Sequence, residues 1–213
     1  MEKFQVAIDG PAGSGKSTIS KLVASKLGFN HIDTGAMYRA VTLEALNRKI
    51  DIENESEYGF LNEIDFEYKN DKILLNGTDV SKEIRSTTVT ANVSAVARLK
   101  VVRDSMVSLQ QNAANKGCVV MDGRDIGYVV LPNANVKVYL TASVEERARR
   151  RLLQETNATF EEILKDIEVR DFKDSNREIS PLKQADDAIL LDTTGISIEQ
   201  VVEKIIMLVK ERI

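Results

Sequence analysis

Gly10-Pro-Ala-Gly-Ser-Gly-Lys16-Ser17 is the most informative stretch of this 213-residue chain. It matches the pattern G-x-x-x-x-G-K-[ST], in which backbone amides surround phosphate oxygens, the lysine reaches the β- and γ-phosphates and the hydroxyl is placed for Mg²⁺. An apolar, strand-like segment precedes it at 4–8, and apolar residues recur at helical spacing over 16–27. The stretch therefore predicts a strand, a glycine turn and a helix that together bind a nucleoside triphosphate with Mg²⁺.

The nucleotide site is expected to extend from this turn to a basic helix later in the chain. Arg147, Arg150 and Arg151 share one face of that helix, and we expect them to close over ATP as a short lid near 149–165; a solvated run of charges is the alternative. Ser17 is the expected metal ligand. The expected nucleotide-binding residues are Gly10, Pro11, Ala12, Gly13, Ser14, Gly15, Lys16, Ser17, Thr18, Arg147 and Arg151.

The rest of the chain alternates between strand-like and helical segments, which predicts an α/β fold with a mostly parallel central sheet. Further strands are expected at 30–33, 118–121, 136–140 and 188–191, and further helices at 35–47, 87–115, after 143, after 159 and at 197–213. Short alternating runs between 64 and 84 surround the turn signal Asn76-Gly77, so a small antiparallel insertion is expected there.

The composition excludes several kinds of chemistry. The chain has one histidine (His31) and one cysteine (Cys118), so a Cys/His zinc site and an internal disulfide are ruled out. With 29 basic and 33 acidic side chains the net charge is −4, which argues against a nucleic-acid binder held by bulk charge. No apolar run reaches the ~18 residues of a membrane span and the N-terminus lacks a secretory pattern, so we expect a cytoplasmic protein. We expect His31 to be structural or solvent-facing and Cys118 to pack as a small hydrophobe.

Two classes of nucleotide-binding protein fit the phosphate-binding turn, namely a switch module and a phosphotransferase. A GTPase switch needs D-x-x-G followed by N-K-x-D, but Asp192-Thr-Thr-Gly195 lies near the C-terminus with no such motif behind it. A kinase for a small phosphorylated acceptor needs a second anion site, and arginines lie near the ends of expected strands, where α/β sheets bind ligands. The phosphotransferase is therefore favoured.

The sequence resembles the bacterial cytidylate kinases of the nucleoside monophosphate kinase family, from Val6 to about Thr194. The motifs that carry the resemblance are I-D-G-P-A-G-S-G-K, D-T-G-A-M-Y-R, S-x-V-A, D-G-R-D-I-G, R-D-x-x-D-x-x-R ahead of S-P-L, and A-x-D-A-x-x-L-D-T-T. The resemblance implies a three-layer P-loop fold with its core at 1–33 and 104–213 and a monophosphate-binding region at 34–103. It also implies ATP-dependent phosphorylation of CMP, and of dCMP, with Mg²⁺; a kinase for UMP or another small acceptor is the alternative.

The resemblance assigns the reading of cytosine to Ser94, Arg103 and Asp125. The chemistry fits, because a carboxylate can accept a hydrogen bond from N4 and an arginine can donate to N3 or O2. Uracil reverses the pattern at N3 and position 4, so the same groups should disfavour UMP.

The remaining acceptor residues also follow from the resemblance. Contacts to the acceptor phosphate fall on Arg39, Arg124 and Arg177, which with Lys16 form the expected catalytic set. Guanidinium groups suit phosphate oxygens because they stay charged and present a fork of donors. Ribose contacts fall on Arg170 and Asp174, while Thr34 and Tyr38 are expected to shape the same pocket. Positions 170, 174 and 177 have the spacing of one helical face.

Two residues depart from the family pattern. Tyr128 stands where many members have a small hydroxyl residue, which bears on the packing of the loop after G-R-D-I-G. Lys100 replaces a usual proline, so we expect a softer helix break there. The sequence shows no extended apolar face for a partner, and we expect a monomer.

Overall fold

The computed structural model describes residues 3–69, 72–153 and 158–213. The chain forms two compact units: the first is Met1–Ile32 with Ala114–Ile213, and the second is Asp33–Ala113. The division between 103 and 104 that the resemblance implies stays a prediction. α4 (Lys100–Ala114), which spans that position, is one continuous helix.

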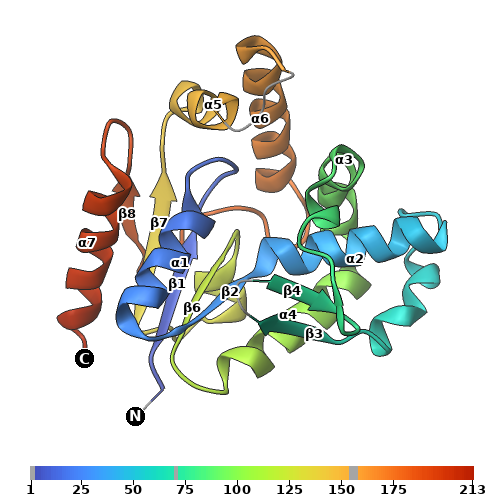
Figure 1. Cartoon of the computed structure of the whole chain (residues 1–213), viewed down its shortest axis with the longest axis horizontal. Coiled ribbons are helices and arrows are strands. Elements are labelled where there is room, and N and C mark those ends of the chain that lie inside the picture. The colour runs from blue at the N-terminus through green and yellow to red at the C-terminus, as the bar shows by residue number, and fades with distance from the viewer. Residues whose placement is uncertain (1–2, 70–71, 154–157) are drawn as a thin grey trace. The chain divides into compact units, whose positions relative to one another are not determined.

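The first unit is built on a five-stranded sheet with the order β2-β6-β1-β7-β8 (Figure 1). Its strands are β1 (Gln5–Asp9), β2 (Asn30–Asp33), β6 (Val119–Gly123), β7 (Val136–Thr141) and β8 (Ile189–Asp192). β1 pairs in parallel with β6 and β7, and Ile8 lies opposite both Asp122 and Val138. The carboxyl ends of these strands therefore lie at one edge, and the expected α/β fold with a central parallel sheet is confirmed.

Helices α1 (Lys16–Leu27) and α7 (Ile198–Lys210) pack against each other and against the apolar side chains of β1 and β7 (Figure 1). Val6, Ile8 and Leu140 are completely buried in this core, as are Val23 and Ile205. α1 is followed by Gly28, which has a φ of 68° and forms a left-handed C-cap. None of the helices within the described residues is long and apolar enough to cross a bilayer.

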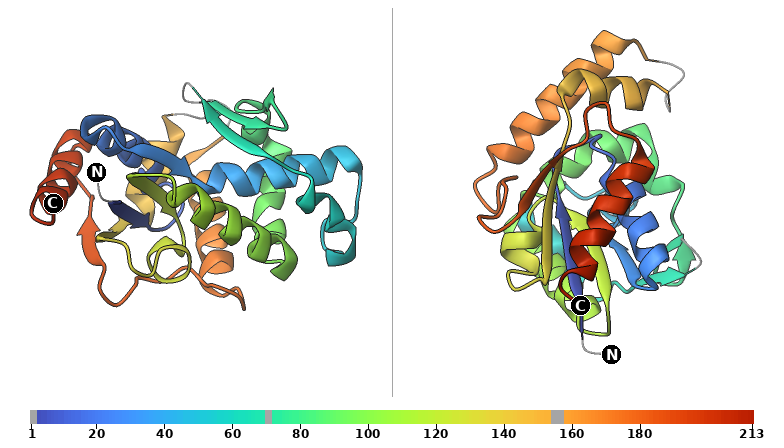
Figure 2. Two further views of the ribbon diagram at one scale, coloured as in Figure 1. Left: turned by 90° about the horizontal axis from the view of Figure 1, so that it is seen from below. Right: turned by 90° about the vertical axis from the view of Figure 1, so that its left-hand side faces the viewer.

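Helices α5 (Val144–Leu152) and α6 (Phe160–Ser175) form a separate pair beyond the ends toward which the strands point (Figures 1 and 2). They pack on each other around Ala148, Ile163 and Ile167, which make a small core of their own. α6 begins at a capping box in which Thr159 and Glu162 bond each other's backbone amides.

The second unit contains α2 (Thr34–Arg48), α3 (Thr87–Val96), α4 and two 3₁₀ segments, Glu55–Asn62 and Glu83–Arg85. It also holds the expected antiparallel insertion, a sheet of β3 (Phe66–Lys69), β4 (Lys72–Leu75) and β5 (Thr78–Asp79) that contacts α2 through β4 (Figure 2, left). Asn76 and Gly77, with φ of 51° and 78°, make the tight turn between β4 and β5.

One helix predicted at 87–115 is in fact two, because the chain breaks between α3 and α4. The break exposes the carbonyl of Ala97, which accepts a hydrogen bond from Arg103 Nη1 at 3.3 Å. The chain therefore bends here although Lys100 replaces the proline usual in the family.

Gly10 joins β1 to the glycine turn, and the structure leaves no room there for a side chain. Its φ is 152°, and a Cβ would lie 2.0 Å from the carbonyl oxygen of Leu140. We expect Gly10→Ala to lower the free energy of unfolding by more than about 2 kcal/mol, because the obstacle is backbone of a central strand.

Gly28→Ala is the matched control for this prediction. Gly28 also has a positive φ, of 68°, but no atom lies within 4 Å of a Cβ built there, so only the backbone cost of roughly 1 kcal/mol applies. Urea unfolding of both variants measures the difference, and equal losses would contradict the steric argument.

Candidate active site

The loop between β1 and α1 has the backbone of an anion-binding site. Gly13 and Gly15 adopt left-handed φ values of 75° and 87°, a conformation that lets successive N–H groups converge on an anion. Gly15 is the N-cap of α1, and no side chain caps the helix, so the first-turn amides are left for a ligand. This geometry matches the role that the sequence predicts for residues 10–18.

Lys16 is the cation of this loop, and it is buried. Its Nζ donates to the carbonyl oxygen of Pro11 at 2.6 Å and to Ser14 Oγ at 3.3 Å. Burial lowers the pKa of Lys16 well below its usual value, and the nearby positive charges of Arg124 and Arg170 lower it further. An anion bound here would reverse that effect, so the loop favours a negatively charged ligand.

Ser17 contacts a carboxylate at the end of the neighbouring strand. Ser17 Oγ donates to Asp122 Oδ2 at 2.7 Å, and Asp122 Oδ1 lies 2.7 Å from His31 Nε2. A hydroxyl and one carboxylate are hard oxygen donors of the kind that hold Mg²⁺ together with phosphate oxygens and water. The described residues contain no group of three or more His, Cys, Asp or Glu side chains suited to a metal.

Asp9, the last residue of β1, anchors the G-R-D-I-G loop. Its two carboxylate oxygens accept the backbone N–H groups of Ile126 at 2.8 Å and Gly127 at 2.7 Å, and the side chain is buried. Burial raises the pKa of Asp9 to about 7, the two N–H groups act against that rise, and the charge of Asp125 adds to it. Arg124 and Asp125 are thus held at the edge of the sheet where the phosphate loop begins.

The first-unit residues that are expected to bind the acceptor form one cluster of charges. Arg124 Nε donates to Asp174 Oδ2 at 2.9 Å, and Arg177 Nη2 lies 3.6 Å from Asp125 Oδ1. Burial alone would raise the pKa of Asp174, but Arg124 and Arg170 hold it below its usual value. The structure therefore brings together all five first-unit residues expected to bind the acceptor: Arg124, Asp125, Arg170, Asp174 and Arg177.

The expectation that 170, 174 and 177 share a helical face is wrong for Arg177. α6 ends at Ser175, so Arg177 lies beyond the helix, where its Nε donates to the carbonyl oxygen of Ser180 at 2.5 Å. Ser180 has a left-handed φ of 50°, which turns the chain back after the helix. The turn, and not helical spacing, directs this arginine to Asp125.

The arginines of α5 bind other parts of the protein. Arg147 is buried, and its Nη1 donates to the carbonyl oxygen of Ala12 at 3.0 Å and to Asp171 Oδ2 at 2.5 Å. A solvated position is therefore wrong for Arg147. The guanidinium joins the phosphate loop to α6.

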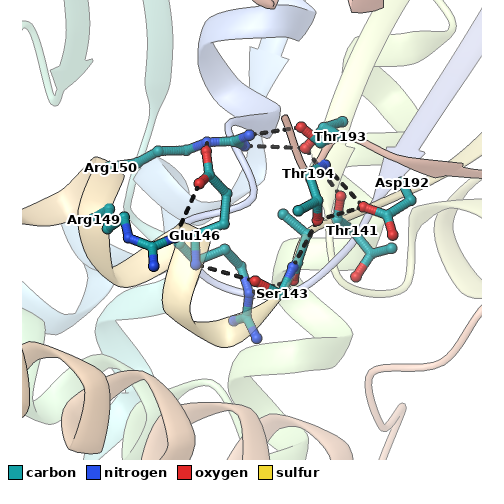
Figure 3. A network of polar contacts seen from close by, with 10 residues as sticks. Thr141, Ser143, Glu146, Arg149, Arg150, Asp192, Thr193 and Thr194 are labelled. Atoms are coloured by element: carbon teal, nitrogen blue, oxygen red, sulfur yellow. Dashed lines mark hydrogen bonds and ion pairs between the residues drawn. The ribbon is translucent and has the colours of Figure 1, made fainter. Parts of the chain in front are cut away.

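Arg150 fastens α5 to the loop after β8, as Figure 3 shows. It donates to Thr193 Oγ1 at 3.0 Å, to the Thr193 carbonyl oxygen at 2.8 Å and to Glu146 Oε1 at 2.9 Å. Arg151 lies in the last turn of α5. The expected lid at 149–165 includes 154–157, which lie outside the described residues, and its closure over ATP stays a prediction.

The second unit holds the other residues that are expected to bind the acceptor, on α2, α3 and α4. Arg39 Nη1 donates to Thr90 Oγ1 at 2.8 Å, and the guanidinium of Arg103 lies 5.6 Å from the centre of the Tyr38 ring. Arg103 is buried, as is Thr34 at the start of α2, while Ser94 on α3 is half-buried. Within this unit the structure gathers Tyr38 and Arg103, and it ties Arg39 to α3.

The cytidylate kinase family model matches residues 6–211 of the chain. The chain belongs to that family. Cytidylate kinase of Acholeplasma laidlawii is 51% identical over 214 residues, which cover 99% of this chain and 96% of that protein. Cytidylate kinase of Bacillus cereus is 51% identical over 217 residues, with coverage of 98% and 96%. The resemblance inferred from the motifs is thereby confirmed over nearly the whole chain.

Solved structures agree with the fold of a cytidylate kinase. A shikimate kinase from Bacteroides thetaiotaomicron has a TM-score of 0.50 at 13% identity, covering 97% of this chain and 98% of that chain. An uncharacterized protein from Eubacterium ventriosum has a TM-score of 0.59 at 12% identity, with coverage of 99% and 100%. At these identities the likeness concerns the fold alone. It confirms the expected phosphate-loop kinase fold.

Sequence reasoning missed several side chains that organise this candidate site. Asp9 and Asp122 each follow a run of buried strand residues. The abrupt change from apolar to acidic residues is a feature of the sequence that could identify them as functional. Asp171 stands inside the R-D-x-x-D-x-x-R motif, beside the residues that were selected. His31 carried no signal, because its partner lies on a strand distant in sequence.

The raised pKa of Asp9 predicts how the stability of the protein depends on pH. The carboxyl pKa is near 3.8 when exposed and about 7 when folded, so ionisation favours the unfolded chain. Asp9→Asn cannot ionise at this position. Relative to that variant, the free energy of unfolding of the natural protein should fall as pH rises from about 4 to 7 and should stay constant above pH 7. The full change is on the order of 4 kcal/mol.

Urea unfolding at several pH values measures this difference. Only its change with pH is diagnostic, because the asparagine also removes one hydrogen-bond acceptor at every pH. Asp166→Asn, at an exposed position on α6, controls for the loss of one negative charge. If the difference in free energy of unfolding between Asp9→Asn and the natural protein stays constant across this pH range, the pKa of the Asp9 carboxyl is not raised by folding.

Proposed function

We propose that this cytidylate kinase family member transfers the γ-phosphoryl group of ATP to CMP, giving ADP and CDP, and that it accepts dCMP as well. The observation that carries the proposal is the placement of two arginines beside the phosphate-loop lysine. Arg124 and Arg170 lie near enough to Lys16 for their positive charges to lower its pKa. Such a concentration of basic groups suits a donor phosphate and an acceptor phosphate that meet in one place.

The chain's own groups supply positioning and charge. We assign Lys16 to the transferring phosphate and Arg39, Arg124 and Arg177 to the phosphate of CMP. Ser17, whose hydroxyl donates to Asp122, would hold Mg²⁺, which when bound neutralises charge on the β- and γ-phosphates. The acceptor is a phosphate oxygen that is largely ionised at pH 7, since its second pKa is about 6. No general base is required, in agreement with the single histidine of the sequence.

The remaining assignments concern the nucleoside. Ser94, Arg103 and Asp125 would read cytosine, and Arg170 and Asp174 would bind the ribose. The pairing of Asp125 with Arg177 and of Asp174 with Arg124 supports the proposal, because each ion pair keeps a buried group charged and oriented before the ligand arrives. A cytoplasmic monomer stays a prediction.

Lys16→Met should lower kcat with every acceptor by about 10²–10³-fold, because it removes the lysine side chain that stabilises negative charge on the transferring phosphate. A coupled assay of ADP release at saturating ATP and CMP measures this. Lys26→Met, an exposed lysine of the same helix, should leave kcat unchanged. Turnover that survives Lys16→Met would refute the assignment of the phosphate loop.

The same assay with CMP, dCMP, UMP, AMP and shikimate tests which acceptor is used, and we expect ADP release with CMP and dCMP to exceed ADP release with the others.

Arg103→Met should raise the KM for CMP by at least about tenfold, corresponding to the loss of a base contact worth about 1–3 kcal/mol, with the KM for ATP little changed. Arg85→Met, an exposed arginine of the same unit, is the control. Equal damage to both substrates would point to a folding defect and not to base recognition.

A further inference from the structure

The only histidine of the chain contacts the phosphate loop through one intermediate residue. His31 lies on β2, Asp122 lies on the adjacent strand β6, and Ser17 opens the helix after the loop. His31 Nε2 is 2.7 Å from Asp122 Oδ1, and Asp122 Oδ2 accepts from Ser17 Oγ at 2.7 Å. The side chain of His31 is 20% exposed and that of Asp122 is 3% exposed. A single buried carboxylate therefore joins a partly exposed imidazole to the loop hydroxyl.

The direction of each hydrogen bond follows from chemistry. An ionised carboxylate only accepts, so His31 Nε2 and Ser17 Oγ must both donate. Once the single proton of Ser17 points to Asp122, its lone pairs face away from the carboxylate and are free to bind a cation. The orientation of Ser17 thus depends on the orientation of Asp122, whose second oxygen is held by His31.

We propose that His31 is a positioning residue that, through Asp122, orients the Ser17 hydroxyl for the divalent cation bound with the nucleotide. Without His31, the buried carboxylate loses the donor that holds Oδ1, and its orientation toward Ser17 is less firmly fixed, because a buried carboxylate turns toward the donors that remain. Ser17 then loses its fixed acceptor. The proposal rests on the phosphate-loop part of the proposed function and is independent of the identity of the acceptor.

Calorimetric titration of ADP into the full-length protein tests this, once with Mg²⁺ and once with a chelator. The difference between the two affinities measures the contribution of the metal. His31→Leu should reduce that contribution by about tenfold or more, the usual effect of removing a group that supports a metal ligand. Metal-free ADP binding should be unchanged, because the loop amides and Lys16 hold the phosphates. Ser17→Ala should show the same selective loss.

The conservative variants separate positioning from general structure. His31→Gln places an amide N–H near the position of Nε2 and should restore the metal contribution, whereas His31→Asn is too short to reach and should not. Asn30→Ala, at the exposed neighbouring position of β2, should behave as the natural protein. The comparison of the glutamine and asparagine variants also decides the question if His31→Leu does not fold.

Three results would overturn the proposal. The first is a metal contribution to ADP affinity that is undiminished in His31→Leu or His31→Asn. The second is a fall in metal-free ADP affinity in these variants as large as the fall in ADP affinity with Mg²⁺. The third is the absence of any metal contribution in the natural protein. Failure of the proposed function is distinguishable, because it would appear as an absence of phosphoryl transfer to CMP while the metal contribution to ADP binding still depends on residue 31.

Discussion

The carboxylate of Asp9 is the constraint on which the loop after β6 depends. It ends β1 directly before the phosphate loop, and its oxygens accept the N–H groups of Ile126 and Gly127. One buried side chain therefore fixes a glycine-containing turn at the strand end from which the phosphate loop begins, where the backbone would otherwise have considerable freedom. Burial makes the contact demanding, because a carboxylate away from water needs strong donors and has few alternatives.

The charges that surround these loops are arranged for anionic ligands. Lys16 is held at a lowered pKa among arginines, while Asp174 is held ionised by Arg124 and Arg170. Basic groups are thus concentrated locally in a chain whose net charge is −4. Bound phosphate groups would relieve the repulsion between them. Total charge says little about the ligand, since local geometry decides which groups face it.

Two further side chains connect the phosphate loop to its surroundings. Arg147 joins the Ala12 carbonyl to Asp171 on α6, and Asp122 joins Ser17 to His31. A phosphotransferase that acts on an already ionised acceptor has no need of histidine as a base. The one histidine is instead found where it supports a neighbouring carboxylate. The scarcity of histidine and cysteine, which excludes a Cys/His zinc site and an internal disulfide, agrees with a mechanism of positioning and charge.

The sequence alone determined the phosphate loop, the α/β class, the antiparallel insertion and the family, because these depend on local backbone chemistry and contiguous motifs. Left-handed glycines, capping residues and the Asn76-Gly77 turn are effects of near neighbours in the chain. Only the tertiary structure decided that Asp9 holds Ile126 and Gly127, and that Arg177 reaches Asp125 from beyond the end of α6. These contacts join residues far apart in sequence, and they exist because strand register places Ile8 opposite Asp122 and brings the strand ends to one edge.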